Sequence, residues 1–141
     1  MTEIINNQRK IKFDWQVFQI FAANCINQIH ETKNKFVTIA FVSDRKMREL
    51  NKTFRAKDST TDVLSFPFEA DEYDLETENL GDIVISAEQA ERQAQENDLS
   101  LENEIKQLIL HGILHLCGYD HETDAGEMNS REIELQEILS V

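Results

Sequence analysis

Three of the chain's four histidines, His111, His115 and His121, lie within a run of eleven residues. His111 and His115 are four positions apart, so on a helix their rings project from one face, one turn above the other. Gly118 offers a position where such a helix can end in a left-handed conformation, and the turn that follows can bring His121 to the same point. Three imidazoles that converge without a fourth protein ligand are typical of a catalytic zinc site, whose open position holds water.

A less specific interpretation is that these histidines are ordinary core or capping residues. The segment around them is apolar, and each unpaired imidazole buried there would cost roughly 1–3 kcal/mol. Metal coordination removes that cost and uses all three rings, which favours a metal site. Cys117 is close enough to be considered as a further ligand, but it follows His115 by two residues and so points to another face of a helix. We therefore expect Cys117 to pack in the interior.

The intervals between the three histidines equal those of the zinc-protease signature His-Glu-x-x-His-x-x-Gly-x-x-His. In that signature, the Glu directly after the first His is the general base. Gly112 stands at this position here, and glycine can neither take nor give a proton. The sequence therefore argues against a conventional metalloprotease.

Hydrophobic and capping patterns predict strands and helices that must position these residues. Strands are expected at residues 2–6, 36–42, 63–68 and 80–85, and helices at 14–30, 43–54, 86–97, 100–118 and 124–139. Pro67 places the third strand at a sheet edge or marks its end. Residues 71–79 are acidic and unpatterned, and predict an exposed loop. The pattern predicts an α+β fold, in which helices pack on a small mixed sheet.

Two helices carry more specific signals. Ser86 together with Gln89 predicts a capping box at the start of the third helix. The last helix has apolar residues available for packing at Met128, Ile133, Leu135 and Ile138.

Length and composition limit the class of protein. With 141 residues, 40% of them hydrophobic, the chain can form one domain over residues 1–141 with a core of its own. No apolar run approaches the roughly 18 residues that a membrane span needs, and the first residues lack the features of a signal peptide. Cys25 and Cys117 lie far apart in predicted helices and are expected to be free thiols. These features predict a cytoplasmic protein.

The net charge of −13 argues at first against a nucleic-acid enzyme. The distribution changes this conclusion, because residues 1–57 hold 11 Lys and Arg against 5 Asp and Glu, whereas residues 58–141 hold 3 against 22. A short basic strip on an acidic body can orient a phosphodiester chain over one site. The strip consists of Arg45, Lys46, Arg48, Lys52, Arg55 and Lys57, and all of these except Arg55 are candidates for RNA binding. The first three also fit a plain solvated helix face.

Three stretches of the chain carry further motifs. They are the run HGILHLCGYDH at residues 111–121, the segment at residues 51–58 and 60–68, and residues 81–86. These stretches resemble the YbeY family of bacterial metal-dependent endoribonucleases. In the order given, they are similar to the family patterns H-G-x-L-H-L-x-G-Y-D-H, N-x-x-[YF]-R-x-x-D-x-x-T-D-V-L-S-F-P and G-D-I-x-I-S, and along the chain the three matches follow the family's order. Ala56 stands where the family often has Gly, and Thr60 where it often has Pro.

This resemblance implies a four-stranded mixed β-sheet packed with about five helices, like the zincin metalloprotease core. It implies cleavage of single-stranded RNA in ribosomal RNA processing, including the 3′ end of 16S RNA, and in quality control of the 70S ribosome. The implied partners are ribosomal RNA and ribosomal particles, with ribosomal proteins or assembly GTPases as further candidates, and neither membrane nor DNA. One Zn²⁺ per chain is expected, with Ni²⁺ or another divalent ion as the alternative.

Arg55 matches the arginine that the resemblance marks as functional, and with His111 it is the candidate for catalysis. Phosphodiester cleavage gains negative charge in the transition state, which a fixed guanidinium would stabilise. The alternative for Arg55 is a surface salt bridge with Asp58 or Asp62.

Four candidates remain for the group that transfers protons. They are Asp120, Glu122, Asp62 and a second water. For Asp120, directly before His121, we favour a different role, in which it accepts the free N–H of a ligand ring and fixes its tautomer.

Two other functions are considered. One is a metal-dependent hydrolase of another substrate, and the other is a ribosome-assembly factor with structural zinc. Structural zinc sites are usually closed by four protein ligands, and the sequence offers three. The residues and the resemblance together favour the endoribonuclease.

Overall fold

The computed structural model describes residues 2–69 and 78–141, so most of the predicted acidic loop at residues 71–79 lies outside the described residues. The elements in chain order are β1 (Glu3–Asn6), α1 (Trp15–Gln28), the 3-10 turn η1 (His30–Thr32), β2 (Phe36–Val42), α2 (Asp44–Arg55), β3 (Val63–Pro67), β4 (Asn79–Ser86), α3 (Ala87–Glu96), α4 (Leu101–Leu116) and α5 (Glu127–Leu139). Each predicted strand and helix is present, with ends that differ from the prediction by up to three residues. In the described ranges, no helix is long and apolar enough to cross a membrane.

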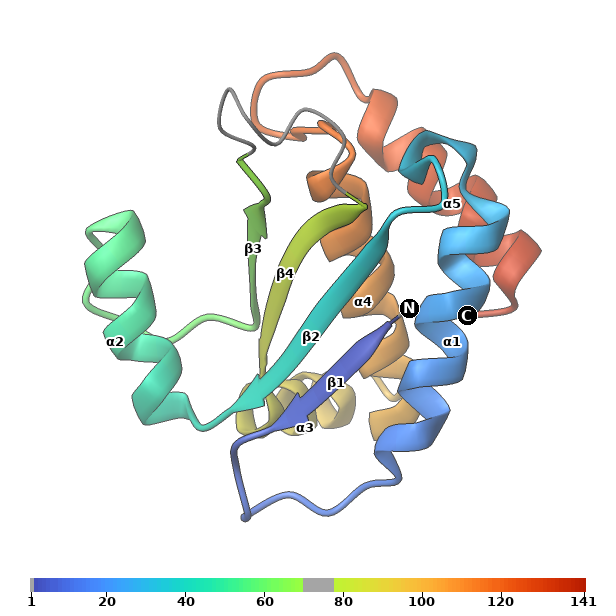
Figure 1. Cartoon of the computed structure of the whole chain (residues 1–141). Coiled ribbons are helices and arrows are strands. Elements are labelled where there is room, and N and C mark those ends of the chain that lie inside the picture. The colour runs from blue at the N-terminus through green and yellow to red at the C-terminus, as the bar shows by residue number, and fades with distance from the viewer. Residues whose placement is uncertain (1, 70–77) are drawn as a thin grey trace.

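The four strands form one mixed sheet in the order β1-β2-β4-β3 (Figure 1). β1, β2 and β4 run parallel, and β3 pairs antiparallel with β4 at the edge. Pro67 is the last residue of β3, so its missing N–H falls at the end of an edge strand, as predicted. The predicted α+β fold, with a four-stranded mixed sheet and about five helices, is confirmed. The packing of a histidine-bearing helix on this sheet is also zincin-like, as predicted.

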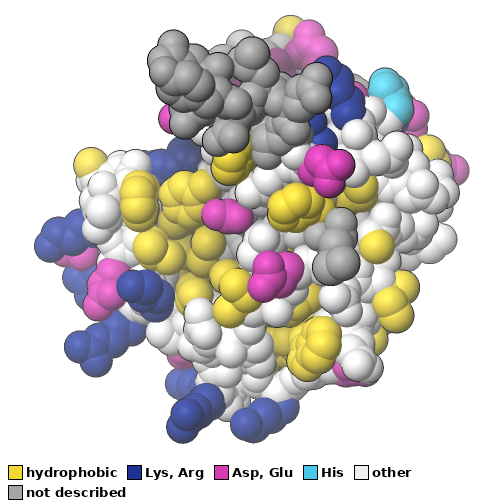
Figure 2. Space-filling model, viewed as in Figure 1, with side chains coloured by type: hydrophobic (Ala, Val, Ile, Leu, Met, Phe, Trp, Pro, Cys, Tyr) yellow, Lys and Arg dark blue, Asp and Glu magenta, His cyan; other side chains and the backbone are white. Residues whose placement is uncertain are grey.

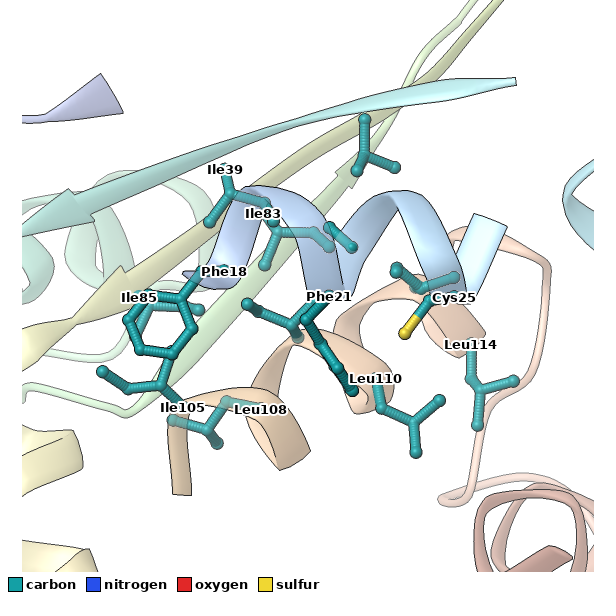
Figure 3. Close-up of a cluster of buried hydrophobic side chains, with 14 of the residues drawn as sticks. Phe18, Phe21, Cys25, Ile39, Ile83, Ile85, Ile105, Leu108, Leu110 and Leu114 are labelled. Carbon is teal, nitrogen blue, oxygen red and sulfur yellow. The ribbon is translucent and has the colours of Figure 1, made fainter. Parts of the chain in front are cut away.

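The main core lies between one face of the sheet and helices α1 and α4 (Figure 3). Ile39 of β2 and Ile83 of β4 are paired in register, point to this face and are fully buried. α4 contributes Ile105, Ile109 and Ile113, which are four positions apart, share one helix face and are also fully buried. Burial of each such side chain contributes about 1.5–3 kcal/mol, so α4 is held firmly by its apolar face.

Helix α2 packs on the other face of the sheet. Met47 of α2 is fully buried in a smaller cluster with Val42, Leu64 and Val84 from three strands. Basic side chains gather on the solvent side of this helix, at the left of Figure 2. The sheet therefore carries the histidine helix on one face and the basic helix on the other, and both approach the edge strand β3.

Two helix starts differ from the prediction. Ser86 Oγ accepts the Gln89 N–H at 3.2 Å, but the Gln89 side chain donates to Gln93 instead of returning the bond. The reason is that the Ser86 N–H is already donated to the Asp62 carbonyl, at 2.9 Å. The capping box is thus half formed. The last helix begins at residue 127 instead of 124.

The packing face of α5 also differs from the prediction. Met128 and Leu135 are buried as expected, but Ile133 and Ile138 are 56% and 54% exposed. Because residues three and four apart share a helix face, the buried face of α5 runs through positions 128, 132 and 135. Position 132 is a glutamate.

Candidate metal centre

The three predicted metal ligands come from the end of α4 and the loop that follows it. His111 and His115 lie on the last two turns of α4, and His121 lies five residues beyond its end. The potential ligand atoms of the three rings all lie within 4.8 Å of one another, and the ring centroids are 4.6, 5.5 and 5.6 Å apart. The structure thus brings the three rings to one point.

The turn after α4 returns the loop to the helix. Gly118 has a left-handed φ of 99°, its N–H bonds to the His115 carbonyl at 3.0 Å, and the Tyr119 N–H bonds to the Leu114 carbonyl at 3.1 Å. This is the glycine helix end that the sequence predicts. A Cβ at Gly118 would meet no described atom within 4 Å, so the backbone conformation is what favours glycine there.

Two of the ligand rings are held by an acceptor at Nδ1. The Nδ1 atom of His115 lies 2.9 Å from the Tyr119 carbonyl oxygen. The Nδ1 atom of His111 lies 3.2 and 3.3 Å from the two carboxylate oxygens of Glu132 on α5. A carbonyl and a carboxylate only accept hydrogen bonds, so both rings carry a proton on Nδ1. The Nε2 atom of each ring is therefore the one available to an ion.

The gap between these two rings fits a cation. The Nε2 atoms of His111 and His115 lie 3.1 Å apart, and two neutral rings protonated on Nδ1 would point bare lone pairs at each other across it. A shared positive ion removes this repulsion. The hydrogen bond to Glu132 raises the pKa of His111, whereas burial and the neighbouring His111 lower the pKa of His115. Three imidazole nitrogens suit zinc and also nickel.

Cys117 packs as predicted and is not part of the ligand group. It is half-buried against the main core, and burial raises the pKa of its thiol to about 11. Metals bind the thiolate, which this environment disfavours. Both Cys117 and Cys25 are free cysteines, in agreement with the prediction.

A cavity of about 470 Å³ opens over the three histidines. Arg55 at the end of α2 and Lys57 just after it line this cavity too. Arg55 is exposed and forms no salt bridge with a described residue. Asp58, one of the two partners considered for it, pairs instead with Arg48 at 2.7 Å. The guanidinium of Arg55 therefore shares one cavity with the imidazoles.

The rest of the basic strip lies elsewhere. Arg48 is engaged by Asp58 at 2.7 Å, and Lys46 pairs with Glu49 at 3.7 Å, which fits the solvated helix face considered for this part of α2. The strip residues that do not line the cavity are Arg45, Lys46, Arg48 and Lys52. Of the six residues of the strip, Arg55 and Lys57 thus line the same cavity as the histidines.

A family model described as Endoribonuclease YbeY matches residues 3–140 of the chain. The chain belongs to the YbeY family. It is 43% identical over 132 residues to the endoribonuclease YbeY of Nautilia profundicola, covering 93% of this chain and 92% of the relative. It is 42% identical to that of Helicobacter pylori, covering 93% and 86%, and 51% identical over 104 residues to that of Aquifex aeolicus, covering 72% and 67%. The resemblance seen in the motifs is confirmed.

This member of the YbeY family also resembles a protein of known structure. The solution structure of a Thermotoga maritima protein superposes with a TM-score of 0.65 at 28% identity, covering 99% of this chain and 89% of that chain. The similarity therefore extends through the whole arrangement of sheet and helices.

The second YbeY motif shapes the segment that carries Arg55. Asn51, which opens this motif, is buried and donates its side-chain amide to the Ser59 carbonyl at 2.9 Å. This bond closes the loop between α2 and β3. Ala56 inside the loop has a left-handed φ of 57°, a backbone conformation that glycine adopts more easily than alanine.

Gly112, at the position of the protease general base, faces the sheet. A Cβ there would lie 3.0–3.2 Å from side-chain atoms of Ile83 on β4. Close packing of α4 on the sheet therefore accounts for this glycine, and a glutamate at this position would have to displace Ile83.

The acidic residues considered for proton transfer, Asp62, Asp120 and Glu122, all line the cavity. The Asp62 carboxylate already accepts the Val63 N–H at 2.7 Å and the Gln93 amide at 3.1 Å, so it is partly engaged in holding the loop.

For His111 and His115, the orienting contact predicted for Asp120 comes from other atoms. The Asp120 carboxylate accepts the Glu122 N–H at 3.0 Å, and the two orienting contacts come from Glu132 and the Tyr119 carbonyl. Sequence reasoning missed Glu132 because it lies 21 residues from His111 and its contact depends on how α5 docks. A carboxylate on the buried face of α5 is the signal that would have found it.

Proposed function

We propose that this chain is a zinc-dependent endoribonuclease that cleaves single-stranded RNA. The observation that carries the proposal is the cavity in which three convergent imidazoles meet Arg55, an arginine that forms no salt bridge with a described residue. The relatives in the YbeY family are named endoribonucleases, which are hydrolases of RNA phosphodiester bonds. The three imidazoles favour zinc, with nickel as the alternative.

His111, His115 and His121 would hold the ion. When bound, a divalent ion at three neutral imidazoles supplies an activated water at neutral pH and offsets charge on a phosphate oxygen. Arg55 and Lys57, which line the same cavity, contribute positive charge. A guanidinium can grip two oxygens of one phosphate, whereas an ammonium acts as a point charge. Arg55 therefore orients and stabilises the scissile group, and Lys57 binds a neighbouring phosphate.

The proposed substrates are ribosomal RNA precursors in the cytoplasm, with the 3′ end of 16S RNA and the RNA of defective 70S ribosomes as targets. The charge distribution supports a substrate that is part of a ribosomal particle. Most of the chain is acidic and would bind free RNA weakly. Ribosomal proteins or assembly GTPases would then supply further contacts.

The proposal is tested by metal analysis of the purified protein together with cleavage of ribosomal precursor RNA, with and without chelator. We expect about one bound ion per chain, cleavage that chelator abolishes, and recovery on adding Zn²⁺. A His115→Ala variant that is folded and metal-free, and that still cleaves normally, would overturn the proposal. Stoichiometric zinc without any cleavage would favour a ribosome-assembly factor, and cleavage of other esters alone would favour a different hydrolase.

A further inference from the structure

Glu132 occupies an unusual place on α5. It lies on the face that also carries Met128 and Leu135, which are 0% and 1% exposed, and its own side chain is 19% exposed. A carboxylate largely removed from water is costly unless a donor satisfies it. The donor here is Nδ1 of His111, at 3.2 and 3.3 Å from the two carboxylate oxygens.

The cation next to Glu132 in the sequence already forms ion pairs with other residues. Arg131, the preceding residue, donates to Glu31 at 2.9 Å and to Glu134 at 2.8 Å. In the part of the chain that the structure describes, the hydrogen-bond partner of the Glu132 carboxylate is therefore the His111 ring.

The contact determines which ring nitrogen of His111 is free. With the Glu132 carboxylate at Nδ1, the proton stays on Nδ1, and Nε2 points into the gap of 3.1 Å toward Nε2 of His115. Without this acceptor, the proton of the neutral ring can move to Nε2 and block it as a ligand. His115 needs no such side chain, because the Tyr119 carbonyl holds its Nδ1.

We propose that Glu132 is a positioning residue of the metal centre: it fixes the Nδ1-protonated tautomer of His111 and thereby raises the affinity of the site for its ion. The inference rests on the proposed function in taking the three histidines as metal ligands. It adds that the last helix, through one carboxylate, prepares the site before the ion arrives.

The first test is the tautomer of His111 in the metal-free protein, read from the ring ¹⁵N chemical shifts at alkaline pH, where the ring is neutral. We expect the proton on Nδ1 in the wild type and a shift toward Nε2 in Glu132→Ala. A wild-type ring with its proton on Nε2 overturns the proposal, and this measurement requires neither a variant nor a bound ion.

The second test is the Zn²⁺ dissociation constant, measured by competition with a chromophoric chelator. We expect Glu132→Ala to bind about 10- to 100-fold more weakly, and Glu132→Gln, which keeps an acceptor oxygen, to recover part of the loss. The matched control is Glu137→Ala, which removes an exposed carboxylate of the same helix and should bind as the wild type does. Unchanged affinity in Glu132→Ala overturns the proposal, whereas a wild type that binds no Zn²⁺ overturns the proposed function and leaves the tautomer result standing.

Discussion

The Tyr119 hydroxyl donates to the Glu31 carboxylate at 2.7 Å, although the two residues are 88 positions apart. Arg131 of α5 donates to the same carboxylate from Nε at 3.0 Å and from Nη2 at 2.9 Å. The Glu31 carboxylate, which follows α1 in the chain, therefore ties the loop that carries Tyr119 and His121 to the last helix.

Replacing this carboxylate by an amide should destabilise the fold. We expect Glu31→Gln to lower the free energy of unfolding by about 2 kcal/mol, because hydrogen bonds to a charged group are lost or weakened. Urea denaturation measures the change. Glu134→Gln is the control, since it removes the more exposed partner of Arg131 and should cost less than about 1 kcal/mol. Equal effects in the two variants would contradict the prediction.

The same carboxylate predicts a pH dependence of stability. Hydrogen bonding from Arg131, and after it from Tyr119, lowers the pKa of Glu31 from 4.5 to about 2. Because the folded pKa lies below the unfolded one, the stabilisation is fully present above about pH 4.5 and is lost as the pH falls toward about 2. The difference in unfolding free energy between wild type and Glu31→Gln should shrink over this acid range. A difference that stays constant there would be evidence against the pair.

Metal binding should raise thermal stability in a way that depends on His121. An ion at 100 times its dissociation constant stabilises the native state by about 2.7 kcal/mol. We expect Zn²⁺ to raise the Tm of the wild type and chelator to reverse the increase. His121→Ala should keep the metal-free Tm, because His121 is exposed, and should show little response to Zn²⁺. An undiminished response in this variant would place the ion elsewhere.

Removing the positive charge of Arg55 should impair cleavage without harming the fold. We expect Arg55→Gln to lower kcat/KM for RNA about 100-fold or more, the range found when a group that stabilises transition-state charge is removed. The control is Arg9→Gln, an exposed arginine outside the cavity lining, with cleavage near that of the wild type. Cleavage assays measure kcat/KM, and circular dichroism checks that both variants are folded. An equal loss of kcat/KM in both variants would count against a specific role of Arg55.

Gly81 should not tolerate a side chain. A Cβ there would lie 2.5 Å from the Phe66 carbonyl oxygen, and φ is 147°, so Gly81→Ala combines a clash between β3 and β4 with backbone strain. We expect a loss of about 3 kcal/mol or more. Gly118→Ala separates the two effects, because it carries strain without the clash and should cost about 1–2 kcal/mol. Urea denaturation of both variants gives the comparison.

Sequence reasoning succeeded where the chemistry is local. The convergence of His111, His115 and His121 follows from helical spacing and one glycine turn, and both are properties of a short segment. The strands and helix caps are local as well. The resemblance to the YbeY family implied a four-stranded mixed sheet, and the order of its strands comes from the structure.

The sequence could not give the contacts that depend on how α5 docks. Its apolar residues suggested a face that included Ile133 and Ile138, whereas the buried face carries Glu132. The choice between Asp120 and Glu132 as the acceptor for a ligand ring is made by tertiary packing, because Asp120 is adjacent in sequence but its carboxylate turns to the Glu122 N–H.

Helix α4 is anchored by its apolar face, with Ile105, Ile109 and Ile113 inside the core, and this anchorage does not involve the histidines. We therefore expect the chain to fold without the ion and to bind it afterwards, unlike a zinc finger, whose folding requires the metal. The metal that occupies the site would then depend on which ions the cell supplies and on how readily they exchange. If the three histidines hold an ion as proposed, growth medium and purification buffer would help to determine which metal a preparation contains.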